Sequence, residues 1–247
     1  MAPPLPLRLI AFDRPGYGNS DPNPNAKSLQ DLTGDVARLV SHLGLKRYAV
    51  VGVSGGGPLA AACARFLPEV SALTLISAVP PPEGVSDGKI ASLMRFGRWP
   101  IAARPVMAVA REFILSPDKA DTAVFGRVIP GRDGVVMNST RRAALLAGIR
   151  EGVRKGTAGA VADASFYGRP WGFRLEDILV PTAVWHGTED HLIPAEAALA
   201  FKSIPNVTLN ILPQEGHYSL ALGQTEKILA DLMARSAESL GEAANPG

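Results

Sequence analysis

The sequence contains a single cysteine, Cys63, among 247 residues. One thiol cannot form a disulfide within the chain and cannot complete any of the cysteine and histidine spacings that bind zinc. We therefore expect no intrachain disulfide and no metal site. Cys63 lies among alanines in a helix-forming run, which indicates a small core residue.

Long hydrophobic runs and a strong excess of one charge are also missing. No unbroken apolar stretch reaches membrane-spanning length, and the N-terminus lacks the basic and apolar regions of a signal peptide. These absences predict a cytoplasmic protein with no membrane partner. A net charge of +2 with 19% charged residues argues against a dedicated nucleic-acid binder, and 47% hydrophobic residues argue against disorder.

Apolar strands alternate with amphipathic helices along most of the chain. This pattern predicts an α/β fold with a mostly parallel sheet, whose ligands bind at the carboxyl ends of the strands. The expected strands are residues 7–12, 47–53, 72–79, 180–185 and 207–212, and the expected helices are residues 29–43, 59–66, 195–201 and 225–232. The small-residue tail, residues 237–247, is expected to fray.

Residues 84–176 interrupt the alternation with helix-forming stretches separated by proline and glycine. We expect residues 1–83 and 177–247 to form the core and residues 84–176, hereafter the insert, to form a helical lid. The insert holds 15 Lys and Arg against 8 Asp and Glu, a net charge of +7, so the rest of the chain carries −5. This excess indicates either a solvated outer face or a preference for substrates that carry a carboxylate or phosphate.

A serine flanked by glycines follows the expected strand at residues 47–53. Gly52, Ser54 and Gly56 match the G-x-S-x-G pattern, with an apolar strand before it and a helix-forming run after it. In a nucleophile elbow this tight turn holds the serine at strained backbone angles and exposes its hydroxyl. We expect a Cβ at Gly52 or Gly56 to clash within the turn.

A serine hydroxyl needs a base to remove its proton, and histidine is the usual base. The chain has four histidines: His42, His186, His191 and His217. His42 lies on an amphipathic helix, and the next two flank a turn. His217 follows the last expected strand in a loop at the carboxyl edge of the sheet, so it is the favoured base.

The acid that orients the base should follow a neighbouring strand. Glu189 and Asp190 both come after the strand at residues 180–185. Asp190 is favoured because it directly precedes a helix that starts at Pro194, whereas Glu189 is expected to turn away. The resulting chain order is Ser54, Asp190, His217, as in α/β-hydrolases.

Four segments resemble the α/β-hydrolase fold family: residues 12–20 (FDRPGYGNS), 52–58 (GVSGGGP), 186–190 (HGTED) and 215–217 (EGH). The resemblance covers nearly the whole chain. It implies a serine hydrolase that acts on a small-molecule substrate without metal or organic cofactor. Epoxide hydrolases and haloalkane dehalogenases carry aspartate at the position of Ser54, so the resemblance disfavours these two classes.

Family members normally begin with three strands, the third ending in a His-Gly loop that supplies one N–H of the oxyanion hole. No such segment precedes Leu7, so the backbone N–H of Gly55 is the one donor that can be assigned. We expect weak activity, a start codon internal to a longer reading frame, and either direct pairing of residues 7–12 with the elbow strand or an open sheet edge that favours a homodimer.

The sequence thus predicts an esterase or lactonase that forms an acyl-enzyme on Ser54. A non-catalytic or weakly active hydrolase-like protein is the alternative from another class. A peptidase, C–C hydrolase or perhydrolase would share the same fold and site.

Overall fold

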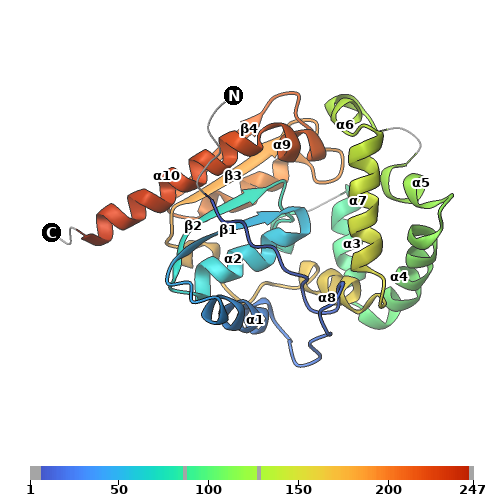
Figure 1. The fold of residues 1–247 in the computed structure, drawn as a ribbon, viewed down its shortest axis with the longest axis horizontal. Helices are drawn as coiled ribbons and strands as arrows, with labels where there is room; N and C mark the ends of the chain where they lie inside the picture. The colour runs from blue at the N-terminus through green and yellow to red at the C-terminus, as the bar shows by residue number, and fades with distance from the viewer. Residues whose placement is uncertain (1–6, 86–87, 127–128, 245–247) are drawn as a thin grey trace.

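Four parallel strands form one sheet in the order β1-β2-β3-β4, flanked by helices on both faces (Figure 1). The computed structural model describes residues 7–85, 88–126 and 129–244. The strands are β1 (Tyr48–Val53), β2 (Val70–Ile76), β3 (Thr182–Gly187) and β4 (Val207–Leu212). The register pairs Val51 with Thr74, Thr74 with Ala183 and Ala183 with Thr208. The expected α/β fold with a parallel sheet is confirmed, and the carboxyl ends of its strands lie at one edge.

The sheet is covered by α1 (Leu29–His42), α2 (Gly57–Phe66) and the 3-10 helix η4 (Ala195–Ser203) on one face. The other face is covered by α9 (His217–Gly223) and α10 (Thr225–Ala244). Between β2 and β3 the insert contributes α3 (Gly88–Gly97), α4 (Pro100–Leu115), α5 (Ala120–Phe125), α6 (Gly131–Val136), α7 (Ser139–Gly152) and α8 (Ala158–Tyr167). Short 3-10 turns are η1 (Ser54–Gly56), η2 (Pro82–Gly84) and η3 (Leu175–Asp177). The insert helices gather at one end of the sheet (Figure 1).

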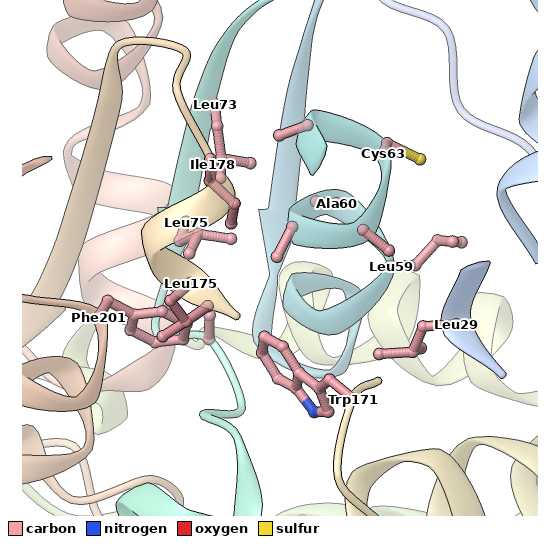
Figure 2. Packing of buried hydrophobic residues seen from close by; sticks show 14 of the residues in the cluster. Leu29, Leu59, Ala60, Cys63, Leu73, Leu75, Trp171, Leu175, Ile178 and Phe201 are labelled. Atoms are coloured by element: carbon pink, nitrogen blue, oxygen red, sulfur yellow. The ribbon is translucent and has the colours of Figure 1, made fainter. Parts of the chain in front are cut away.

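The core lies between β2 and α2 (Figure 2). Leu73 and Leu75 of β2 are fully buried, as is Phe201 of η4. Trp171, which follows α8, packs against Phe201 with ring centroids 6.3 Å apart. Cys63 is a buried core residue as predicted, and burial raises the pKa of its thiol to about 12.

Residues 7–12 do not form the expected strand. They run as irregular chain with Leu9 73% exposed, and β1 is the edge of the sheet. The apolar run at residues 7–12 fits a strand, but a strand exists only where a neighbour pairs with its backbone, and this segment stands apart from β1. A cavity of about 660 Å³ separates it from the sheet, lined by Leu9, Val51 and Leu232 among others. Of the two expected arrangements, the structure therefore has the open edge, and the homodimer through it stays a prediction.

The C-terminal tail also differs from the expectation. Helix α10 continues to Ala244, beyond the expected end at Leu232 and through most of the segment expected to fray. Alanine, glutamate, leucine and methionine are strong helix formers, and they continue the helix that Thr225 begins. Residues 245–247 lie outside the described part of the chain.

Candidate active site

Ser54 occupies a strained turn at the carboxyl end of β1. Its φ angle is +51°, in the left-handed region that side chains rarely adopt. A Cβ at Gly52 would lie 2.7 Å from the Cα of Gly57, so the residue before the turn must be glycine. The matching expectation for Gly56 is wrong, because a Cβ there would meet open space. The close approach is at Gly57, where a Cβ would lie 2.6 Å from that of Ala78.

Asp190 and His217 are joined by a hydrogen bond. The Nδ1 of His217, at the start of α9, lies 2.8 Å from Oδ2 of Asp190 in the loop after β3. The other carboxylate oxygen accepts the backbone N–H groups of Leu192 at 2.9 Å and Ile193 at 2.8 Å. Glu189 is exposed, so the loop directs the two acids to opposite sides as expected.

These bonds keep Asp190 ionised. Burial raises the pKa of its carboxyl. The hydrogen bonds from His217 and from the N–H of Ile193 lower it by more than burial raises it, so the pKa lies below its ordinary value. A carboxylate that accepts at both oxygens holds its neighbour in one tautomer. His217 therefore carries a proton on Nδ1 and has Nε2 free to accept another.

Ser54 and His217 both follow the carboxyl ends of strands, at the same end of the sheet. Ser54 follows β1, the outer strand on one side, and His217 follows β4, the outer strand on the other side. No hydrogen bond joins the Ser54 hydroxyl to His217 within the described residues. Catalytic hydrogen bonds of this kind often tighten only when substrate is present. The roles of Ser54, His217, Asp190 and the Gly55 N–H thus remain predictions.

A buried polar cluster holds the residue that follows Ser54. The carbonyl of Gly55 accepts hydrogen bonds from Arg14 and from the hydroxyl of Tyr167, both at 2.8 Å. Asp163 of α8 pairs with Arg14 and accepts the hydroxyl of Tyr17 at 2.8 Å. It also lies 3.1 Å from the Tyr167 hydroxyl, whose single proton is shared between Asp163 and the Gly55 carbonyl. A Cβ at Gly55 would lie 2.4 Å from the Tyr167 hydroxyl. The insert thus reaches into the elbow.

Opposed effects act on the ionisation of this cluster. Burial raises the pKa of the Asp163 carboxyl, against the lowering effects of Arg14 and the two tyrosine hydroxyls. Burial lowers the pKa of the Arg14 guanidinium, but the Asp163 carboxylate outweighs it, so that pKa is raised. Sequence reasoning missed Asp163 and Tyr167. Their spacing of four residues places them on one helix face, but nothing in the sequence connects that face with Ser54.

His186, at the end of β3, is fully buried beside the acid. Its Nε2 lies 2.8 Å from the carbonyl of Ile193 and 3.5 Å from Asp190 Oδ2, and its Nδ1 has no partner within the described residues. A carbonyl only accepts, so the proton is on Nε2. Burial lowers the pKa of this imidazole, against the raising effects of Ile193 and Asp190.

The lowered pKa of His186 predicts a pH dependence of folding. In the unfolded chain this imidazole takes up a proton near pH 6.5, which the folded protein binds only at lower pH. The free energy of unfolding therefore falls as the pH falls below about 6.5, by at most roughly 1.4 kcal/mol per pH unit from this group. Urea unfolding at pH 7.5, 6.5 and 5.5 measures the effect.

His186→Gln removes this titration while keeping a donor for Ile193. We expect the variant to be less stable at pH 7.5 but to show a shallower decline towards pH 5.5. The exposed His42 on α1 provides the control, and His42→Gln should keep the wild-type decline. Identical declines in His186→Gln and the wild type would contradict the assignment.

None of the described helices is both long and apolar enough to cross a bilayer. The same residues contain no group of three or more His, Cys, Asp or Glu side chains placed to hold a metal ion.

The site can be compared with known proteins. A family model described as the alpha/beta hydrolase fold matches residues 1–224. A non-heme haloperoxidase of Rhodococcus erythropolis is 29% identical over an alignment of 246 positions, which covers 92% of this chain and 81% of the relative. A 2-hydroxy-6-oxononadienedioate/2-hydroxy-6-oxononatrienedioate hydrolase of Cupriavidus pinatubonensis is 26% identical over an alignment of 224 positions, which covers 86% of this chain and 70% of the relative.

A solved carboxylesterase structure from Nitrososphaera gargenis shares the fold. Its TM-score is 0.62 at 18% identity, with 91% of this chain and 78% of that chain covered. The family model spans most of the chain and includes Ser54, Asp190 and His217. This chain therefore belongs to the alpha/beta hydrolase fold family.

Proposed function

We propose that this protein is a serine hydrolase that cleaves an ester-like bond through an acyl-enzyme on Ser54. The observation that carries the proposal is the 2.8 Å hydrogen bond between His217 Nδ1 and a fully buried, ionised Asp190. This pair lies at the sheet edge where the positive-φ Ser54 ends β1. A histidine with only a structural role in a loop needs no ionised carboxylate hydrogen-bonded to its Nδ1.

In the proposed reaction the Ser54 oxygen attacks the carbonyl carbon as its proton passes to His217 Nε2. The tetrahedral intermediate then expels the alcohol, which takes that proton, and leaves the acyl group on Ser54. Water, activated by the same imidazole, attacks the acyl-enzyme and releases the acid. Asp190 stabilises the imidazolium in both halves. The Gly55 N–H donates to the oxyanion, an interaction typically worth about 3–4 kcal/mol.

A perhydrolase is the second candidate, favoured by the name of the Rhodococcus relative. Hydrogen peroxide would replace water in the second half and release a peracid from the same acyl-enzyme. A C–C hydrolase is the activity that the name of the Cupriavidus relative suggests. It would use the same residues on a vinylogous diketone. The three reactions differ in substrate and acceptor.

The test is a substrate panel combined with a fluorophosphonate probe. The proposal expects the probe to label Ser54 and short-chain p-nitrophenyl esters or lactones to be hydrolysed. Peracid formation in added hydrogen peroxide that outpaces hydrolysis would favour the perhydrolase, and turnover of the vinylogous diketone alone would favour the C–C hydrolase. Absence of labelling would leave the non-catalytic alternative.

The cluster around Gly55 predicts a smaller effect on rate. Tyr167→Phe removes the hydroxyl that donates to the Gly55 carbonyl, 2.8 Å away, and so loosens the residue that carries the oxyanion N–H. One such bond is worth about 1 kcal/mol, so kcat for an ester should fall about fivefold. Steady-state kinetics measures it.

Tyr17→Phe is the matched control for this change. Tyr17 also donates to Asp163, but the described contacts include no bond from it to Gly55. We expect this variant to keep kcat within twofold of the wild type. Equal losses in the two variants would show that the cluster acts through general stability.

A further inference from the structure

A buried carboxylate of the insert accepts three backbone N–H groups at the start of α9. Asp133 of α6 is 5% exposed. Its Oδ2 lies 2.9 Å from the N–H nitrogen of His217, and its Oδ1 lies 2.9 Å from that of Tyr218 and 2.7 Å from that of Ser219. The residue that contributes the imidazole is thus bonded to the insert through its own backbone.

The space around this carboxylate is fitted to it. A Cβ at Gly216 would lie 2.5–2.6 Å from the carboxylate atoms of Asp133. The φ and ψ angles of Gly216 are −103° and −161°, which any residue adopts. The three atoms nearest to such a Cβ all belong to Asp133, so the approach of this carboxylate requires glycine there.

The insert meets the same segment at two other points. Arg132 forms an ion pair with Glu215 at 3.4 Å, and Phe125 packs on Tyr218 with ring centroids 5.9 Å apart. Both contacts are made by side chains and leave the backbone of His217 untouched. Among the described residues of the insert, Asp133 is the one whose side chain accepts a hydrogen bond from the backbone N–H of His217.

We propose that Asp133 is a positioning residue that fixes His217 for proton transfer, a role that rests on the proposed function. Asp190 orients the imidazole at Nδ1, but the place of the ring also depends on where the backbone of residue 217 lies. Asp133 sets that place. Without it three N–H groups lose their acceptor, the first turn of α9 shifts, and Nε2 moves relative to Ser54. A misplacement of about 1 Å costs about 100-fold in rate.

The test compares two substitutions of Asp133 in the full-length protein. Asp133→Ala should lower kcat for a p-nitrophenyl ester about 10- to 100-fold and leave KM within threefold, because the residue is buried and contacts the backbone of His217. Asp133→Asn should fall between this variant and the wild type. Its oxygen still accepts from Tyr218 and Ser219, but its amide nitrogen faces the His217 N–H as donor against donor.

Two insert variants serve as controls. Asp121→Asn weakens a pair with Arg142 inside the insert, and Arg132→Gln breaks the pair with Glu215. Both should keep kcat within about threefold. A loss in Arg132→Gln as large as in Asp133→Ala, or a kcat in Asp133→Ala within twofold of the wild type, would overturn the proposal.

A double-mutant cycle with Gly216→Ala isolates the contact. Gly216→Ala should lower kcat by displacing the carboxylate, but it should cost less in the Asp133→Ala background, where the three nearest atoms that the new Cβ meets are gone. Full additivity of the two effects would count against the contact.

Amide hydrogen exchange tests the role without any enzymatic activity. In Asp133→Ala the amides of residues 217–219 should exchange at least about tenfold faster than in the wild type and in Asp121→Asn, because they have lost their acceptor. Unchanged exchange overturns the proposal. If the wild-type protein has no hydrolase activity but exchange is still faster in Asp133→Ala, the proposed function is rejected and the structural link between Asp133 and residues 217–219 is kept.

Discussion

Ser54→Ala is expected to abolish ester hydrolysis and fluorophosphonate labelling while the protein stays folded. Ser54 is only half-buried, and alanine keeps its Cβ in the strained turn. Loss of the hydroxyl removes the nucleophile, so kcat should fall by about 10⁴-fold or more. Ester kinetics and thermal unfolding on the same preparation separate loss of chemistry from loss of structure.

His217→Ala should cost nearly as much, and the two losses should not add. Nucleophile and base act as a unit, so removing either leaves little for the other to do. The backbone N–H of residue 217 remains available to Asp133 in the alanine variant. A double variant much slower than either single variant would show that Ser54 and His217 act separately.

The second large effect is expected at Asp190. In Asp190→Asn the side-chain oxygen can still accept from Leu192 and Ile193, which turns the amide nitrogen towards His217. That nitrogen donates, so Nδ1 of the imidazole must accept and its proton moves to Nε2. With the wrong tautomer facing Ser54, kcat should fall by up to about 10⁴-fold.

Glu189→Gln is the matched control for this substitution. Glu189 is the adjacent acid, exposed to solvent, and its loss should change kcat less than twofold. Ester kinetics of both variants over pH 6–9 compares them. A larger loss in Glu189→Gln than in Asp190→Asn would show that the wrong carboxylate had been chosen.

Local signals predicted most of the fold. Ser28 and Asp31 form the capping box that starts α1, and Gly44, at φ +66°, follows its end. Residues 7–12 carry an equally good apolar pattern, but a strand forms only with a partner strand, which is distant in sequence, so the pattern alone does not decide whether these residues form one. The small residues at 237–244 predict fraying, but the alanines among them are also helix formers and continue α10 to Ala244.

The candidate site was predictable where its residues sit in recognisable turns. Ser54 lies between the glycines of the elbow, and Asp190 and His217 follow strands at one sheet edge. The roles of Asp133 and Asp163 were not predictable, because their partners are far away in the sequence. Asp133 lies 84 positions from His217, and Asp163 lies 149 positions from Arg14. Those distances are set by how the insert folds back on the core.

The insert touches the elbow through α8 and the histidine loop through α6. The insert therefore supports the backbone beside Ser54 and the backbone of His217, the two residues proposed to react. We expect a graft from a relative to alter turnover together with selectivity unless it carries an equivalent of the Asp133 carboxylate, which accepts from residues 217–219, and of the Tyr167 hydroxyl, which donates to Gly55.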